Sequence, residues 1–216
     1  TVIAGAGNDL IGANAGNDWI DGGDGVDLQT FEGTPTGSIT VDLVAGRAWG
    51  EGNDTVIGIE NVLGSVFNDS ILADAQNNSL DGNAGDDTIL AGAGNDTLDG
   101  NTGNDSLAGG AGNDSLLGGA GLDWASYIAA SGAVTVDLSA TVPNATGADG
   151  NDTLTGIENI QGGNFADSIL GDSLINTLDG SAGDDTLSGG LANDNLIGGL
   201  GNDLLDGGAG IADYAI

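Results

Sequence analysis

Aspartates recur every nine residues over much of the chain, and their type and spacing could do chemistry. From residue 82 to residue 126 the sequence divides without a gap into GNAGDDTIL, AGAGNDTLD, GNTGNDSLA, GGAGNDSLL and GGAGLDWAS, with Gly at position four and Asp at position six. Carboxylate oxygens are ligands for hard cations such as calcium. A catalytic carboxylate pair, as in glycosidases, would occur once rather than in identical copies. The pattern therefore favours a row of metal ligands over one active site.

The amino-acid composition excludes several kinds of catalytic and binding site. The 216 residues include 43 Gly and 33 Asp and Glu, but a single basic residue (Arg47) and no His, Cys or Met. The chain therefore lacks the residues for a Ser-His-Asp or Cys-His nucleophile, a zinc site of the usual kind, a disulfide or a P-loop. A net charge of −32 repels nucleic acid and anionic lipid, and no apolar run approaches the roughly 18 residues of a membrane span. We predict no catalysis, no nucleic-acid partner and no membrane insertion by this segment.

The nine-residue spacing of aspartates extends beyond the central blocks. One further run opens the chain, and another covers residues 162–215. The candidate metal-ligating side chains are Asp9, Asp18, Asp27, Asp69, Asp87, Asp96, Asp105, Asp114, Asp123, Asp167, Asp185, Asp194 and Asp203.

Short strands must position these aspartates. The first six residues of each block are rich in Gly, Asn and Asp, which permit tight turns, and the last three suit a strand whose middle residue faces inward. Such a strand is stable only if it pairs with the strand one turn later, about 4.8 Å along the axis. With two blocks per turn, residues 55–126 would form four turns. The predicted inward residues are Ile11, Ile20, Ile89, Leu98, Leu107, Leu116, Ile169, Leu178, Leu187, Leu196 and Leu205, with Ala125 a weaker case.

A longer period lies on top of the nonapeptides. Residues 52–72 return as residues 150–170, an offset of 98, and the alternating segments 38–43 and 133–138 that precede them predict strands. The predicted organisation is a nonapeptide run over 1–30, a β-rich spacer over 31–54, a nonapeptide array over 55–126, a second spacer over 127–152 and a second array over 153–216. Both ends fall inside the repeating pattern, so we expect the segment to belong to a longer chain.

The nonapeptides resemble the RTX (repeats-in-toxin) family, whose calcium-binding repeats form a β-helix. The resemblance implies an all-β, right-handed parallel β-roll with Ca²⁺ between each turn and the turn two nonapeptides later. The best implied sites join Asp87 with Asp105, Asp96 with Asp114, Asp105 with Asp123, and Asp185 with Asp203, and about ten ions would be an upper bound. The implied carbonyl ligands are those of Gly92, Gly94, Asn95, Gly103, Asn104, Gly110, Gly112, Asn113, Gly183, Gly201 and Asn202.

Several loops depart from the family pattern. Asn78 and Asn176 stand where Asp is expected, so sites at these loops are poor candidates. The stretches that contain Glu60 and Glu158 are out of nonapeptide phase, which leaves the role of these two residues open. In the last block Ala212 takes the place of Asp, and the carboxylate shifts by one position.

The aromatic residues allow fewer conclusions. Trp19 and Trp124 occupy position seven, which faces outward, so they either mark a docking surface or pack on intervening strands. Phe67 and Phe165 fall at position four of irregular loops, and we predict that they fill the core.

The resemblance implies a function in which calcium folds the chain. We hypothesise a calcium-folded structural or adhesive segment of a larger secreted protein, such as a surface layer, adhesin or matrix filament, located outside the cell after type I secretion. Self-association and cell-surface or matrix partners are consistent with this role. The alternative is the accessory C-terminal region of a secreted enzyme, such as a protease, lipase or epimerase, or of a pore-forming toxin.

Overall fold

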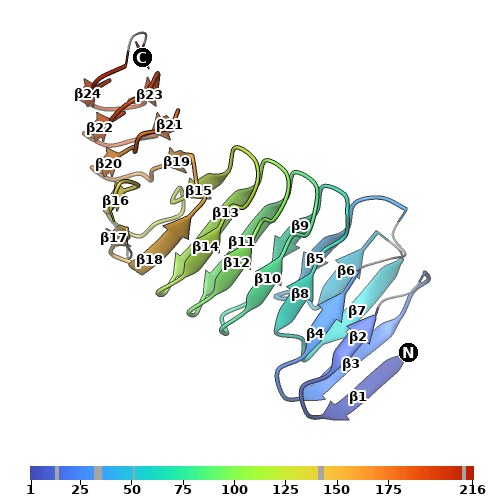
Figure 1. The fold of residues 1–216 in the computed structure, drawn as a ribbon. Coiled ribbons are helices and arrows are strands. Elements are labelled where there is room, and N and C mark those ends of the chain that lie inside the picture. Colours follow the sequence, from blue (N-terminus) through green and yellow to red (C-terminus); the bar gives the residue numbers. More distant parts are fainter. Residues whose placement is uncertain (13–14, 32–35, 51, 141–143, 211–212) are drawn as a thin grey trace.

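The computed structural model describes residues 1–12, 15–31, 36–50, 52–140, 144–210 and 213–216. These residues form strands and turns, with no helix among them, and the strands make two sheets that face each other along a solenoid (Figure 1). In spatial order, the first sheet consists of β1 (Val2–Ala6), β3 (Trp19–Asp24), β7 (Asn53–Ile57), β6 (Arg47–Trp49), β5 (Thr40–Asp42), β9 (Ser70–Leu72), β11 (Thr88–Ala93), β13 (Ser106–Ala111), β15 (Trp124–Ser126), β19 (Asn159–Gln161), β21 (Thr177–Asp179), β23 (Asn195–Ile197) and β25 (Tyr214–Ala215).

The second sheet contains the strands that alternate with these along the chain. In spatial order they are β2 (Leu10–Gly12), β4 (Leu28–Thr30), β8 (Asn61–Leu63), β10 (Ser79–Asp81), β12 (Thr97–Asp99), β14 (Ser115–Leu117), β18 (Gly150–Thr155), β17 (Ala145–Gly147), β16 (Val134–Asp137), β20 (Ser168–Leu170), β22 (Thr186–Ser188) and β24 (Leu204–Asp206). The all-β, mainly parallel roll expected from the sequence is confirmed.

The register confirms two nonapeptides per turn. Leu80 pairs with Leu98 between β10 and β12, and Ile89 pairs with Leu107 between β11 and β13, so each strand meets the strand eighteen residues later. Parallel pairing with this constant offset stacks identical block positions on top of one another. The stack brings aspartates that are distant in sequence to the same edge of the solenoid.

Position eight supplies the core, as the alternation predicts. Ile89, Leu98 and Leu107 are completely buried, and so is Ala125, the weaker candidate. Leu205, near the C-terminal end, is only partly buried. Gln29 is an exception because it occupies an inward position with no exposed surface, between Ile11 and Val62 in register. The core is therefore a thin double row of side chains that includes one polar residue, Gln29, among its described inward strand positions.

The two spacers enter the sheets as antiparallel three-stranded units. The first unit, β7–β6–β5, lies in the first sheet between β3 and β9, whereas β4 and β8 pair directly in the second sheet. The second unit, β18–β17–β16, lies in the second sheet between β14 and β20, while β15 pairs directly with β19. Each spacer therefore lengthens one face by two strands, roughly 10 Å. Figure 1 shows the coils beyond β19 running in a different direction from the central coils.

The structure corrects one sequence prediction about the aromatic residues. Trp19 and Trp124 lie on the outer face, as expected. The prediction that Phe67 and Phe165 fill the core is wrong, since their exposed fractions are 38% and 43%. At position four neighbouring coils touch through their backbones, and a Cβ at Gly85 would overlap the Phe67 carbonyl group. No room is left there for an inward aromatic ring.

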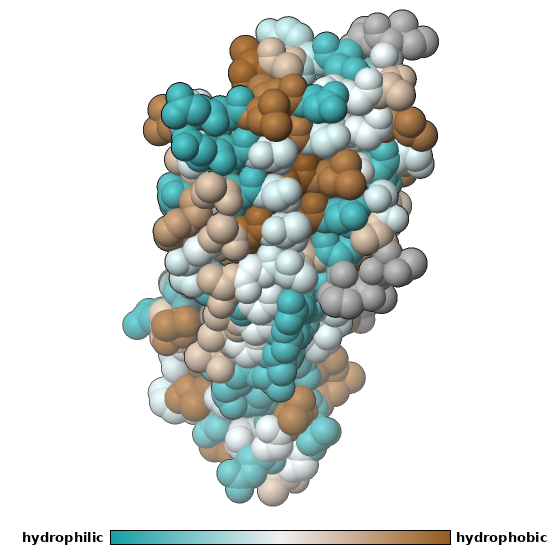
Figure 2. Space-filling view, turned by 90° about the vertical axis from the view of Figure 1, so that its left-hand side faces the viewer, coloured by the Kyte–Doolittle hydropathy of each residue, from teal (hydrophilic) through white to brown (hydrophobic). Residues whose placement is uncertain are grey.

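Hydrophobic side chains also reach the surface toward the C-terminal end. Figure 2 shows them gathered in the upper part of the molecule, at the height of the C-terminal coils. Leu174, Ile175, Leu191 and Leu200 are among the exposed large hydrophobic residues of this half. None of the described segments is a helix of the length and apolar character needed to cross a membrane.

Candidate metal sites

The position-six aspartates form a ladder along each edge of the solenoid. The backbone N–H of Asp87 donates to Oδ1 of Asp105 at 2.8 Å, and the N–H of Asp105 donates to Oδ1 of Asp123 at 2.8 Å. On the other edge the N–H of Asp96 donates to Oδ1 of Asp114 at 2.8 Å. Each carboxylate is thus held by the coil before it, with one oxygen used and the other left for another partner.

The structure brings together the four loop pairs that the resemblance implied. Three belong to the central array, and the fourth joins Asp185 to Asp203, with an N–O distance of 3.1 Å. Asp9 is paired in the same way with Asp27 near the N-terminal end. Asp18 follows the same pattern, since its N–H donates to Oδ1 of Asp54 at 2.9 Å.

Nine of these carboxylates have a buried oxygen without a hydrogen-bond partner among the described residues. The side chains whose Oδ2 atom is buried and unpartnered are Asp9, Asp27, Asp87, Asp96, Asp105, Asp114, Asp123, Asp185 and Asp194. A buried charged group that lacks a partner is strongly destabilising. Rows of such oxygens at stacked positions fit a divalent cation, and oxygen-only donors fit calcium.

Burial acts directly on the acidity of these groups. Desolvation raises the pKa of Asp87 from 3.8 to about 7, with the neighbouring carboxylates of Asp69 and Asp105 adding to the rise. Burial likewise raises the pKa of Asp105 and of Asp114 to about 6. Burial therefore disfavours the charged form of these carboxylates near neutral pH, and a bound cation would offset this cost.

Glycine turns complete the cradle around the unpartnered oxygens. Oδ2 of Asp105 lies where a Cβ on Gly100 would stand, and Oδ2 of Asp114 does the same at Gly109. Gly112 has a φ of +146° and rests on the carbonyl group of Gly94, which only glycine permits. No three carboxylates cluster within the described residues. Backbone carbonyl oxygens, of which these turns present several, are available as further ligands of a calcium ion.

Five acidic residues that the sequence prediction omitted or left open also belong to the ladders. One is the shifted carboxylate of the last block, Asp213, whose Oδ1 accepts from Asp194 N–H at 3.2 Å. Glu60 Oε2 accepts from Asp27 N–H at 2.8 Å, and Glu158 Oε2 accepts from Asp123 N–H at 3.0 Å. Asp54 and Asp152 accept from the aspartates one coil earlier, at 2.9 and 3.0 Å. The GND sequences at 52–54 and 150–152 match the repeat and could have identified Asp54 and Asp152 as ladder members. The longer side chain of Glu adapts the ladder to the change of phase at a spacer.

The two asparagine loops are not equivalent. The Asn78 side-chain amide donates to the Glu60 carbonyl oxygen at 2.6 Å, which leaves its Oδ1 buried and unpartnered, like the aspartate oxygens. In Asn176 the corresponding Oδ1 accepts from Asp172 N–H at 2.9 Å. The Asn78 loop therefore retains a free neutral oxygen, whereas the Asn176 loop does not. Ala212, at the last irregular loop, lies outside the described residues.

Asp69 and Asp167 differ from the other ladder members because the protein satisfies both carboxylate oxygens. Asp69 accepts from Ile39 N–H at 2.8 Å and from Ser65 N–H at 2.6 Å. Asp167 accepts from Val134 N–H at 2.8 Å and from Gly163 N–H at 2.7 Å. These aspartates connect each spacer to the coil that follows it. Their oxygens have the least need of a metal ion.

A second ladder, which the sequence prediction missed, runs beside the first. The side-chain oxygen of the position-five Asn or Asp accepts from the backbone N–H one coil later, as Asn95 does from Asn113 at 2.8 Å and Asp86 does from Asn104 at 2.8 Å. Its donor–acceptor direction is opposite to that of the aspartate ladder. These residues are exposed, so we assign them to holding the coils together.

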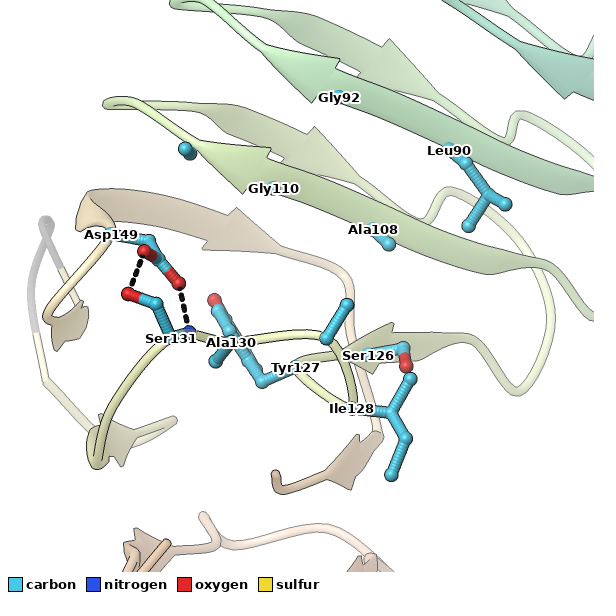
Figure 3. Close-up of a pocket in the computed structure, with 12 residues that line it drawn as sticks. Leu90, Gly92, Ala108, Gly110, Ser126, Tyr127, Ile128, Ala130, Ser131 and Asp149 are labelled. Atoms are coloured by element: carbon cyan, nitrogen blue, oxygen red, sulfur yellow. Dashed lines mark hydrogen bonds between the residues drawn. The ribbon is translucent and has the colours of Figure 1, made fainter. Parts of the chain in front are cut away.

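The cavity drawn in Figure 3 is separate from the ladders. It has a volume of about 400 Å³ and lies between the outer face of β11 and β13 and the segment that follows β15. Its lining is mainly apolar, and Ser131 hydrogen bonds to Asp149 at its edge, which lowers the pKa of the Asp149 carboxyl. The Tyr127 hydroxyl donates a hydrogen bond to Oδ2 of Asp152 at 3.1 Å. The cavity does not present a pair of groups poised for acid–base chemistry.

Taken together, stacked coils, glycine turns and rows of unpartnered carboxylate oxygens define a calcium-binding β-roll. A family model described as the RTX calcium-binding nonapeptide repeat matches residues 1–28, 63–98, 90–125 and 179–211, more than half of the chain. The chain belongs to this family, and its repeats are calcium-binding repeats. A search of curated proteins found no match.

Proposed function

We propose that the chain is a calcium-folded structural or adhesive segment of a larger secreted protein. The observation that carries the proposal is the set of nine buried, unpartnered Oδ2 atoms. Calcium would supply the positive charge that these oxygens lack, and the chain itself has only Arg47 as a cationic side chain. The ladder hydrogen bonds and the glycine turns orient the oxygens, so binding and folding are coupled.

This coupling gives a reason for folding to depend on the compartment. In low calcium the net charge of −32 keeps the chain expanded by self-repulsion, which suits passage through a type I secretion channel. Extracellular calcium modules bind at about 10⁻⁴–10⁻³ M, so the roll would form outside the cell. We propose about ten ions as the upper limit.

A structural role is supported by the architecture of the two spacers. Each extends one sheet and leaves the other continuous, and the two spacers act on opposite sheets. A repeated unit that changes the direction of a rigid roll suits a spacer or filament segment. We propose no catalytic role for this segment, because its acidic residues are stacked copies and its described cavity lacks a reactive pair.

Calcium titration of the chelated protein, followed by far-UV circular dichroism, tests the proposal. We expect little regular structure without calcium, a cooperative gain of β signal with calcium, and a weak response to magnesium, which requires a stricter octahedral site. A chain that keeps its full β signal in excess chelator at pH 8 would contradict metal-coupled folding.

A further inference from the structure

The first spacer brings the only cationic side chain of the protein to the same face as two tryptophans. Trp19 of β3 pairs with Thr55 of β7, and Thr55 pairs with Arg47 of β6. Trp49 lies two residues beyond Arg47 on the same strand, next to Thr40 of β5. The register therefore places Trp19, Arg47 and Trp49 on neighbouring positions of the first sheet. We call these three residues the Trp–Arg face.

Burial shows that this face points outward. Ile20 and Ala48, which alternate with the face residues along β3 and β6, are buried, whereas the exposed fraction of Trp19 is 45%. Arg47 is exposed, and none of the described carboxylates forms an ion pair with it. The face therefore combines an exposed indole, a half-buried indole at Trp49 and a guanidinium that no described carboxylate pairs with. It has no part in the aspartate ladders.

The second spacer provides an internal comparison. Its three strands have the same pairing pattern, with Val136 opposite Ala145 where the first spacer has Val41 opposite Ala48. Aligned on these pairs, Thr146 corresponds to Trp49 and Asn144 to Arg47, and the strand before the unit carries Ser115 in place of Trp19. Asn144 is buried and bonds to both backbone groups of Leu154. The backbone of the spacer therefore does not require the aromatic and basic residues.

We propose that the Trp–Arg face binds a neutral polysaccharide. Indole rings pack against the C–H face of a pyranose ring and bury much apolar area at small entropic cost. The guanidinium of Arg47 is a planar set of donors for sugar hydroxyl oxygens. From the strand spacing the two tryptophans are roughly 12 Å apart, which is the span of a short oligosaccharide.

The charge of the molecule selects a neutral chain over an acidic one. The calcium-loaded roll stays acidic, because ten bound ions would reduce the net charge of −32 only to about −12. This charge repels uronates and sulfated glycans, and one arginine cannot offset it. This inference rests on the proposed adhesive function, for which it names a partner. It needs calcium only because calcium folds the roll that carries the Trp–Arg face. Failure of folding and failure of glycan binding are therefore measured separately.

The test uses the full chain loaded with calcium, with circular dichroism confirming that every variant is folded. Binding is measured by affinity electrophoresis and tryptophan fluorescence with a soluble β-glucan, a mannan and a galactomannan, and with polygalacturonate as the acidic comparison. We expect binding to at least one neutral polymer and none to polygalacturonate. The double variant Trp19→Ser/Trp49→Thr, which copies the second spacer, should lower the affinity by at least about tenfold.

The matched control is Trp124→Ser, which removes an outward tryptophan from the central array and should leave binding unchanged. Arg47→Gln should weaken binding without affecting the calcium-dependent β signal. Absence of binding to all three neutral polymers, preference for polygalacturonate, or full retention of binding in the double variant would each overturn the proposal.

Discussion

The central coils and the coils that restart after each spacer solve the same electrostatic problem in different ways. In the central array the Oδ2 atoms of Asp87, Asp96 and Asp105 are buried and unpartnered. After the spacers, Asp69 and Asp167 direct the equivalent oxygen to the N–H of Ser65 and of Gly163 in their own loops. The same residue type at the same block position therefore keeps an unpartnered oxygen in one region and is satisfied by the protein in the other.

This difference shows how regular coils can resume after a spacer in a solenoid with a thin core. A spacer interrupts one ladder, so the first aspartate after it lacks a preceding coil of nonapeptide geometry. The spacer strands supply the missing donors instead, through Ile39 and Val134. The coil beyond each of these points then stacks on a fixed carboxylate, as Asp87 does on Asp69 and Asp185 does on Asp167.

The largest expected effect is that of calcium removal on the central coils. At pH 8 in excess chelator, we expect the amides around Asp87–Asp123 to lose their protection, because several buried carboxylates would carry unopposed charge. Residual protection, where present, should be confined to the segments 65–69 and 163–167. Hydrogen exchange measured by mass spectrometry, with and without calcium, checks this pattern. Stronger residual protection in the central array than in these segments would refute the comparison.

The next effect separates a metal ligand from a structural aspartate. Asp105→Ala should reduce the number of bound calcium ions by up to two, because the residue is paired with Asp87 on one side and Asp123 on the other. Asp69→Ala should leave the number of ions unchanged and lower the free energy of unfolding at saturating calcium by about 1–3 kcal/mol, since two buried N–H groups lose their acceptor.

Equilibrium dialysis measures the ion count of both variants, and thermal unfolding in saturating calcium measures their stability. Asp206→Ala is the matched control, because its carboxylate is exposed and accepts only from Gly208 within its own turn. An equal loss of ions in Asp105→Ala and Asp69→Ala would show that the two aspartates do not differ.

The sequence predicted the repeat, the two residues per turn that enter the core, and the partners of the ladder. The repeat and the inward residues follow from the nine-residue period, whereas the loop pairs of the ladder follow from the resemblance to the RTX family, in which an ion joins loops two nonapeptides apart. The sequence did not predict which aspartates the protein satisfies by itself, since the donors of Ile39 and Val134 come from segments outside the period. Glu60 was left open for the same reason, because its ladder position depends on how the spacer is accommodated. Phe67 was misassigned because hydrophobicity outweighed the backbone contact at position four.

Protonation of the central carboxylates should change the folding of the chain, by less than calcium removal does. Burial raises the pKa of Asp87 to about 7 and of Asp105 and Asp114 to about 6, so the calcium-free roll favours their neutral forms. This contribution to stability is fully present below the ordinary value of 3.8 and is lost as the pH rises through about 6 to 7. We therefore expect the chelated chain to gain β signal on acidification from pH 8 to pH 5.

Circular dichroism in chelator across this range makes the measurement. The variant Asp105→Asn removes one titrating group and keeps the size of the side chain, so it should gain less β signal over the same interval. A β signal that falls on acidification in chelator would show that burial does not control these carboxylates.

The smallest effect concerns the coil that precedes the first spacer. Gln29 occupies the inward position between Ile11 and Val62, and neither its Oε1 nor its Nε2 atom has a partner. Gln29→Leu removes two buried unsatisfied groups at nearly constant volume, so it should raise the free energy of unfolding at saturating calcium by about 1–3 kcal/mol. The reverse change in the central array, Leu98→Gln, should destabilise the roll, because it adds the same cost at a fully buried position. Thermal unfolding of both variants in calcium gives the two values, and a Gln29→Leu variant less stable than the parent would mean that the amide has a stabilising role in this coil.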